Sequence, residues 1–340
     1  MSVRFKLIYL LQVNELYQLV NTEDSDNDDI LFSVVVCYKK IKTDIDTRLF
    51  LSFFKTSSLV DDKILLLRSQ LQSLFSGEVL EIKNKIDRVD FVILTSREQE
   101  VFNVSQKVER KTNNLDVIKI NNYLEWNYEK YCGALIVGNS GSGKSYLIYS
   151  LLKKIEAITN INNVLICDCK FDELKEFALK SNFKNVAHDL REVREYITNT
   201  LDIVNERFKK RDKSELEPIF LIIDELAVLK LILSKKDNDL VMKEIKELVL
   251  KARASKVFLI LSLQYQNSAQ GVDMSIVSSL SLKILLGNNV QNFKNLFEVT
   301  SKDSEFITKD IGEGYYSING GEISLFYSPY IIGVDDVLNS

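Results

Sequence analysis

Residues 138–145 read Gly138-Asn139-Ser140-Gly141-Ser142-Gly143-Lys144-Ser145, which matches the G-x-x-x-x-G-K-[ST] pattern of a phosphate-binding loop in full. An apolar run precedes this loop and an amphipathic run follows it. Glycines let the backbone approach phosphate closely, and amides at a helix start point at the anion. Lys144 is expected to reach the β- and γ-phosphates of ATP, and Ser145 to supply an oxygen to Mg²⁺. A glycine-rich turn that only begins a helix would not explain the lysine and serine.

The sequence after about residue 113 alternates apolar strand-like runs with helical stretches. Nearly continuous apolar runs are typical of strands buried on both faces, as in a parallel sheet covered by helices. Apolar residues between Leu147 and Ile155 form a stripe that can pack a helix on such a sheet. The expected strands are Cys132–Val137, Val164–Cys167, Ile219–Ile223, Val257–Leu263 and Leu282–Leu286.

Two carboxylates, Asp224 and Glu225, directly follow the run Ile219–Ile223. An aspartate there can hold Mg²⁺ through water, and the neighbouring glutamate can orient and polarise the attacking water. The doublet could instead simply begin a helix, because the helix dipole favours acidic residues in the first turn. Its place on the second apolar strand after the phosphate-binding loop favours the catalytic interpretation.

Another polar residue, Gln264, follows the run Val257–Leu263. This run can lie between the strand before the phosphate-binding loop and the strand before Asp224. Gln264 would then point at the γ-phosphate as a sensor, although a polar residue can also merely cap a strand.

Residues 1–112 have a different pattern, with short β-rich runs at Leu31–Tyr38, Arg48–Phe54 and Phe91–Thr95 around a helical stretch at Asp61–Phe75. They predict a small α+β domain of unknown role, followed by an ATPase domain over residues 113–340. Near the C-terminus, Asn319-Gly320 between two short runs predicts a hairpin, since both residues tolerate the positive φ angles of a type I′ turn.

The composition of the 340 residues, with a net charge of −4, gives no overall basic signature, so contacts to nucleic acid would need local patches. Four scattered cysteines (Cys37, Cys132, Cys167 and Cys169) are expected to be buried free thiols. A single histidine, His188, leaves too few ligands for a structural zinc site. No apolar run is long enough to span a membrane, and no signal peptide is visible, so a cytoplasmic protein is expected.

Other classes of P-loop protein require sequence motifs that are absent from this chain or that occur in the wrong order. Asn84–Asp87 spells the guanine-reading N-K-x-D, but it precedes the phosphate-binding loop, whereas GTPases place it afterwards. No ABC-transporter signature of the L-S-G-G-Q kind occurs, and a small-molecule kinase would not need the Asp224-Glu225 doublet. The sequence therefore predicts an α/β, RecA-like P-loop NTPase fold with a mainly parallel sheet, preceded by the small α+β domain.

Four further segments, in order, resemble the FtsK/SpoIIIE family of DNA translocases, including its smaller members on plasmids and integrative conjugative elements. The resemblance covers about residues 115–335. Ile166–Leu174 resembles the family's I-D-P-K-x-x-x-L segment, with Cys169 replacing proline, and the helix Val193–Arg211 resembles its E-R-R-Y helix. Leu250–Gln264 resembles the G-R-A-x-G-I-H-L-x-x-A-T-Q block. Gly312–Tyr316, followed by Ser328–Tyr330, resembles the closing G-x-G-x-x-Y hairpin and P-Y element.

The resemblance implies a ring, expected to be a hexamer, with ATP at the subunit interfaces and double-stranded DNA in a central channel. Arg253 would be the finger that reaches a neighbour's γ-phosphate, with Arg207 as runner-up, although either could be an ordinary surface arginine. Lys230–Lys236 stands where related motors carry a pore loop, although such lysines are commonly just a solvated face. A relaxase or a membrane-bound transfer machinery would be a fitting partner.

Two positions depart from the family pattern: Lys256 replaces a glycine, and Tyr265 replaces an arginine. No winged-helix module is expected after the motor core, so DNA binding should be nearly independent of sequence. The leading function is ATP-dependent translocation of duplex DNA in plasmid or conjugative-element transfer. The alternatives are a HerA-like or packaging ATPase of the same fold, and an ATP-gated assembly switch, against which Glu225 weighs because a switch needs no water-activating base.

Overall fold

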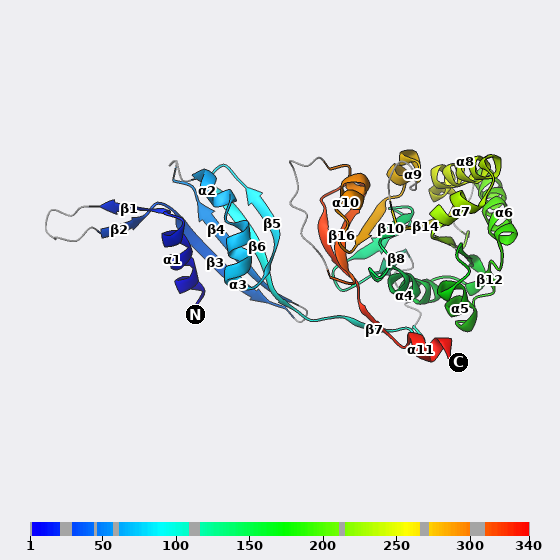
Figure 1. Cartoon of the computed structure of the whole chain (residues 1–340), viewed down its shortest axis with the longest axis horizontal. Helices are drawn as coiled ribbons and strands as arrows, with labels where there is room; N and C mark the ends of the chain where they lie inside the picture. The colour runs from blue at the N-terminus through cyan, green and yellow to red at the C-terminus, as the bar shows by residue number, and fades with distance from the viewer. Residues whose placement is uncertain are drawn as a thin grey trace. The chain divides into compact units, whose positions relative to one another are not determined.

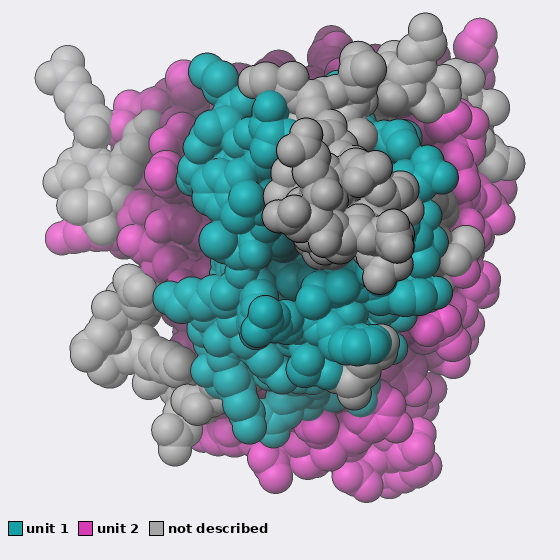
Figure 2. Space-filling view, turned by 90° about the vertical axis from the view of Figure 1, so that its left-hand side faces the viewer, with its two compact units in different colours: residues 1–99 teal, residues 100–340 magenta. Residues whose placement is uncertain are grey.

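A computed structural model of the chain describes residues 2–20, 29–43, 46–56, 61–108, 116–210, 215–265, 272–299 and 310–339 (Figure 1). The chain forms two compact units, Met1–Gln99 and Glu100–Ser340, which Figure 2 colours separately. The boundary between the units lies before the predicted boundary at residue 112. The reason is that β7 (Val101–Asn103) pairs in parallel with β18 (Tyr330–Ile332) and so belongs to the second unit.

The first unit is a small α+β domain, as predicted, built on an antiparallel sheet with the order β3-β4-β6-β5. Alternate residues of β4, namely Leu49, Leu51 and Phe53, form a buried cluster with apolar residues of the helices. The elements are α1 (Val3–Val13), β1 (Tyr17–Val20), β2 (Asp29–Phe32), β3 (Val35–Lys42), β4 (Asp46–Phe54), α2 (Asp61–Leu65), α3 (Arg68–Phe75), β5 (Glu78–Asn84) and β6 (Arg88–Arg97).

Several details of this unit differ from the sequence prediction. The run Leu31–Tyr38 is split between β2 and β3, and the stretch Asp61–Phe75 forms two helices that part at Leu66 and Leu67. Leu67 is buried while Leu66 is 76% exposed, so apolar spacing continues across a break that periodicity alone does not detect. Helix α1 and strand β5 were not predicted.

The second unit contains an eight-stranded sheet with the order β12-β11-β13-β14-β10-β15-β16-β17. The strands from β12 to β15 in this order are parallel, and β16 and β17 add an antiparallel edge. All five predicted strands are present with small shifts at their ends. The strands are β10 (Ala134–Gly138), β11 (Val164–Asp168), β12 (Asn185–Val186), β13 (Ile219–Asp224), β14 (Val257–Leu263), β15 (Leu282–Leu286), β16 (Glu313–Ile318) and β17 (Ser324–Tyr327).

Helices cover both faces of this sheet, which explains its continuously apolar strands (Figure 1). Ile136 of β10 packs in one cluster with residues of α4 and α5, and Leu135 packs in another with residues of α6 and α8. The helices are α4 (Lys144–Glu156), α5 (Glu173–Lys180), α6 (Leu190–Lys209), α7 (Leu226–Ile232), α8 (Lys235–Lys251), α9 (Met274–Ser279), α10 (Val290–Phe297) and α11 (Val334–Leu338). Short 3₁₀ turns lie at Ile161–Asn163 and Arg253–Ser255, and a small hairpin pairs β8 (Val117–Lys119) with β9 (Glu125–Asn127).

The predicted hairpin near the C-terminus is confirmed. Asn319 and Gly320, between β16 and β17, have φ angles of 53° and 68°, as a type I′ turn requires. Gly314 of β16 allows the close approach of β15, because a Cβ there would lie 1.7 Å from the carbonyl oxygen of Leu285.

The cysteines only partly follow the prediction. All four are free, and Cys167 and Cys169 are buried, but Cys132 is half-buried and Cys37 is exposed. Cys37 lies on β3, most of whose side chains are exposed, so the expectation of burial was wrong there. Among the described residues, no helix is long and apolar enough to cross a membrane, and no group of three or more His, Cys, Asp or Glu is arranged to hold a metal ion.

Candidate nucleotide site

The phosphate-binding loop joins the end of β10 to the start of α4, as the sequence predicted. Gly141 and Gly143 have φ angles of +77° and +94°, in the left-handed region that favours glycine. Helix α4 begins at Lys144, so its amino-terminal amides and its positive dipole end lie at the loop. The loop therefore offers a concave backbone and partial positive charge suited to an anion.

Segments far away in the sequence hold this loop in place. The amide of Gly312 donates a hydrogen bond of 3.0 Å to the Ser142 carbonyl. A Cβ on Gly143 would lie only 3.3 Å from the Gly312 nitrogen. The Asn289 side-chain amide donates to the Asn139 side-chain oxygen at 3.1 Å. Gly312, at the start of the closing hairpin segment, thus supports the phosphate-binding loop directly.

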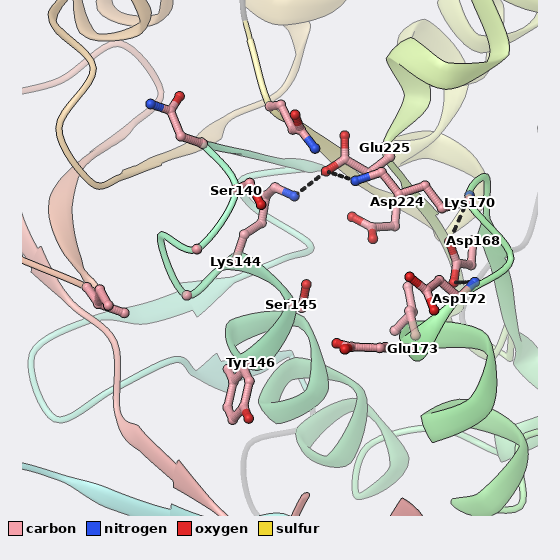
Figure 3. Close-up of a pocket in the computed structure, with 16 residues that line it drawn as sticks. Ser140, Lys144, Ser145, Tyr146, Asp168, Lys170, Asp172, Glu173, Asp224 and Glu225 are labelled. Carbon is pink, nitrogen blue, oxygen red and sulfur yellow. Dashed lines mark hydrogen bonds and ion pairs between the residues drawn. The ribbon is translucent and has the colours of Figure 1, made fainter.

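A cavity of about 390 Å³ lies beside the loop and brings most of the predicted site residues together (Figure 3). Strand β14 lies between β10 and β13, as predicted, so the carboxyl ends of these strands meet at one edge of the sheet. The lining residues are Asn139, Ser140, Gly141, Gly143, Lys144, Ser145, Tyr146, Asp168, Lys170, Asp172, Glu173, Leu174, Asp224, Glu225, Gln264 and Ile311.

Glu225 is at the centre of the charge network in this cavity. Its Oε1 atom lies 2.6 Å from the Lys144 Nζ atom and 3.2 Å from the Lys170 Nζ atom. Burial alone would raise the pKa of this carboxyl group, but Lys144 and Lys170 together hold it below its usual value. Glu225 also has a φ of 54°, a strained conformation of the kind that is common at functional sites. The glutamate is therefore held as an anion in one orientation.

Asp224 is almost completely buried, and burial raises the pKa of its carboxyl group. The hydroxyl of Ser262 donates to its Oδ1 atom, and the Glu225 amide donates to the Ser262 hydroxyl oxygen at 3.2 Å. Ser262 thus links both carboxylate residues to β14. The sequence analysis missed Ser262, although a lone polar residue within the run Val257–Leu263 was a usable signal.

Lys170 and Asp168 are further site residues that the sequence analysis quoted only as part of a family segment. Asp168, at the end of β11, accepts hydrogen bonds from the backbone amides of Lys170, Asp172 and Lys175 at 3.0, 2.9 and 3.1 Å. These bonds fix the turn that leads into α5. Asp168 therefore positions the loop that carries Lys170 toward Glu225 (Figure 3).

The residues present fit a nucleoside triphosphate with Mg²⁺. The phosphate-binding loop lines the cavity with Gly141 and Gly143, whose left-handed backbone lets the loop curve around phosphate, and with the cation Lys144. Ser145 and Asp224 both line the cavity and face each other across it in Figure 3. A hydroxyl, a carboxylate, water and phosphate oxygens are the ligands that Mg²⁺ takes in such sites. Gln264 also lines the cavity.

The two arginines lie elsewhere. Arg253 is exposed in the turn before the amino end of β14, at the opposite edge of the sheet from Gln264. It acts electrostatically on Cys132, just before β10, where burial raises the thiol pKa to about 12 and Arg253 opposes this rise. Arg207 donates to the carbonyl oxygens of Glu217 and Ser255 at 2.9 and 3.2 Å. These contacts give Arg207 a structural role beside that turn.

Lys256 adopts the conformation that a glycine would adopt. Its φ of 51° and ψ of 42° are left-handed, which explains the glycine of the family pattern at this position. Within the predicted pore-loop stretch, Lys235 and Lys236 are exposed at the start of α8 and Leu231 is 81% exposed.

The sequence and the structure were compared with those of known proteins. No protein-family model matches the chain. The FtsK domain-containing protein YdcQ of Bacillus subtilis (strain 168) is 21% identical over 290 residues, which cover 79% of this chain and 60% of that protein. The pCW3 conjugation coupling protein TcpA, in its monomer form with ATPγS, has a TM-score of 0.54 at 16% identity and covers 98% of this chain and 97% of its own.

A third protein, the cytoplasmic domain of EssC, has a TM-score of 0.55 at 10% identity and covers 98% of this chain and 63% of its own. At such identities the solved structures bear on the fold alone. The predicted RecA-like P-loop fold and the predicted resemblance to FtsK/SpoIIIE-type proteins are confirmed. The chain spans 60% of the length of its curated relative.

Proposed function

We propose that this chain hydrolyses ATP and uses the energy to move along double-stranded DNA, in the transfer of a plasmid or conjugative element. The observation that carries the proposal is the charge network at the cavity, where Lys144 and an anionic Glu225 meet beside the phosphate-binding loop. A module that only binds nucleotide has no need of a buried, oriented carboxylate. The similarity to an FtsK domain-containing protein and to a conjugation coupling protein supports the choice of DNA as the track.

Each group of the cavity has a distinct role in this proposal. Lys144 leaves Glu225 and pairs with the β- and γ-phosphates, while amides of the loop hold the remaining phosphate oxygens. Glu225 then orients and polarises the attacking water, and Gln264 senses the γ-phosphate. Ser145 and Asp224 would hold Mg²⁺, which neutralises charge on the phosphates when it is bound. All five side chains line one cavity.

We further propose that subunits assemble into a ring, expected to be a hexamer. Arg253 is separated from the cavity of its own chain, because it lies before the amino end of β14 while the cavity lies at the carboxyl ends. It can therefore act as a finger only on the nucleotide of a neighbouring subunit. Its exposure leaves the guanidinium accessible to that neighbour.

Contacts to DNA would come from local patches in the ring channel, because the net charge of each chain is −4. Lys235 and Lys236 are the proposed contributors, since both are exposed at the start of α8. A cytoplasmic location and a relaxase or membrane-bound transfer machinery as partner belong to the same proposal.

The proposal is tested by the steady-state ATPase rate with and without long duplex DNA. We expect long duplexes to stimulate the rate more than short duplexes at equal total concentration of DNA base pairs. Only an enzyme that moves along DNA has a rate that depends on the length of the duplex. A rate that duplex DNA leaves unchanged, together with failure to displace a protein roadblock, would favour the assembly switch.

A further inference from the structure

We propose that Lys170 is a positioning residue that holds the Glu225 carboxylate in place after bound triphosphate has drawn Lys144 away. This inference rests on the proposed role of Glu225 in activating water. It assigns a function to a lysine that lies outside both the phosphate-binding loop and the Asp224-Glu225 doublet.

The two lysines share one oxygen atom. Lys144 Nζ and Lys170 Nζ lie 2.6 and 3.2 Å from Glu225 Oε1, and the side chains of Lys144 and Glu225 are only 7% and 4% exposed. Bound β- and γ-phosphates would compete for the Lys144 ammonium group and draw it away from this oxygen. A carboxylate buried to this degree needs a remaining cation, because an unpaired buried charge is costly.

The turn that carries Lys170 is held by contacts that do not involve Lys144, so Lys170 can stay in place when Lys144 moves. Its backbone amide is bonded to the Asp168 carboxylate, which also binds the amides of Asp172 and Lys175. The intervening Phe171 has a φ of 57°, so the turn has a specific, non-extended shape. In Figure 3 the Lys170 side chain approaches Glu225 from the side opposite Lys144. Phosphates bound by the phosphate-binding loop therefore compete for Lys144, while Lys170 retains its position.

The arrangement has two chemical consequences. Lys170 leaves the buried Glu225 carboxylate with a positive partner once Lys144 has moved to the phosphates. It also limits rotation of the carboxylate, leaving the other oxygen, Oε2, available to accept a hydrogen bond from water. Lys170 thus acts on the reaction through Glu225 and not through the phosphates.

The test compares Lys170→Ala and Lys170→Arg with Lys180→Ala, a control at the exposed far end of α5 that does not line the cavity. The alanine variant should lower kcat by about tenfold to a hundredfold, a typical share of acid–base positioning, with affinity for ATPγS within threefold of wild type. Arginine should restore most of kcat, and the control should equal wild type.

The split between kcat and KM separates positioning from a general structural defect. A residue that only orients the Glu225 carboxylate acts on the chemical step, so Lys170→Ala should lower kcat while KM for ATP stays within threefold of wild type. Lys170→Arg should regain kcat without a change in KM. A normal kcat in Lys170→Ala, or a kcat that folded Lys170→Arg fails to regain, overturns the inference.

Affinity for a fluorescent ATPγS analogue and for its ADP counterpart provides a readout without turnover. A selective loss of ATPγS affinity in Lys170→Ala would place Lys170 on the γ-phosphate and overturn the inference. Glu225→Gln distinguishes this failure from failure of the proposed function. If that variant still turns over normally, then the role of Glu225 is wrong; if it is inactive while Lys170→Ala is normal, only the role of Lys170 is wrong.

Discussion

The carboxyl ends of the parallel strands form one edge of the large sheet, and their amino ends form the opposite edge. Charged side chains are held in opposite ways at these two edges. At the carboxyl edge, Lys144, Asp224 and Glu225 are buried and held by several contacts within one chain. At the amino edge, Arg253 is exposed, and the neighbouring Arg207 is the arginine that donates a hydrogen bond to the backbone, at the Ser255 carbonyl oxygen. The difference teaches that the nucleotide cavity is preorganised within a single chain, whereas the amino edge leaves Arg253 exposed, as the proposed finger on a neighbouring subunit requires.

The largest expected effect comes from the carboxyl edge. Lys144→Ala should abolish productive ATP binding and lower turnover by about 10³-fold or more, because the lysine supplies the positive charge that the β- and γ-phosphates need. The variant also leaves Glu225 with Lys170 as its remaining cation. Fluorescent nucleotide titration and ATPase assays measure both effects, with circular dichroism as the check of folding. Near-normal turnover in a folded variant would refute the assignment of the phosphate-binding loop.

Glu225→Gln should retain nucleotide affinity and lower kcat by about 10²- to 10³-fold, because the amide preserves size but cannot polarise water. Loss of the negative charge also releases Lys144 for the phosphates, so affinity should not fall. Isothermal titration with ATPγS, alongside single-turnover hydrolysis, separates the two quantities. Equal losses of binding and turnover would argue against a role as base.

A substitution at the amino edge should have a smaller effect on ATP hydrolysis, and this effect should depend on assembly of the subunits. Arg253→Ala should lower hydrolysis at least about tenfold and leave ATP binding intact, since a finger stabilises charge only in the transition state. Arg207→Ala is not a matched control, because Arg207 bonds the backbone carbonyls of Glu217 and Ser255 and its loss should reduce stability.

Mixing Arg253→Ala with Glu225→Gln subunits sharpens the comparison between the two edges. A mixed interface can pair an intact Glu225 on one subunit with an intact Arg253 on its neighbour, so some activity should return. The mixing ratio is followed by native mass spectrometry. Absence of rescue in rings shown to be mixed would count against Arg253 as the finger.

The smallest effect is expected from the turn at Lys256. Lys256→Gly should raise the free energy of unfolding by about 0.5 kcal/mol, because a left-handed φ of 51° strains any residue with a Cβ. The lost ion pair of 3.1 Å with Glu129 offsets only a few tenths of a kcal/mol. Urea unfolding checks the prediction, with Glu129→Gln as the control that removes the ion pair alone. A free energy of unfolding equal to or below that of wild type would contradict it.

Sequence patterns recovered the parallel strands and the phosphate-binding loop because each is coded locally, by continuous apolar runs and by a fixed motif. The place of Gln264 at the cavity also followed from strand order. Contacts between distant segments could not be predicted in this way. The bond from Gly312 to Ser142 and the approach of Lys170 to Glu225 join residues whose spacing carries no periodic signal.

The division within Asp61–Phe75 was missed for a related reason, since apolar spacing continues through the break at Leu66. The strain at Glu225 could not be predicted either, because no pattern in the sequence marks that residue as having a positive φ. At Lys256 the family pattern has a glycine, and the left-handed backbone of Lys256 gives the physical reason for that glycine.

Coupling of ATP hydrolysis at this cavity to movement along duplex DNA is the central claim, and displacement of a protein roadblock bound to a long duplex tests it most directly. Wild-type protein with ATP should clear the roadblock, whereas Glu225→Gln should bind ATP and leave the roadblock in place, because its cavity keeps the phosphate-binding loop and Lys144 but lacks the anionic carboxylate. Displacement by the wild type that is no faster than displacement by Glu225→Gln would contradict the account.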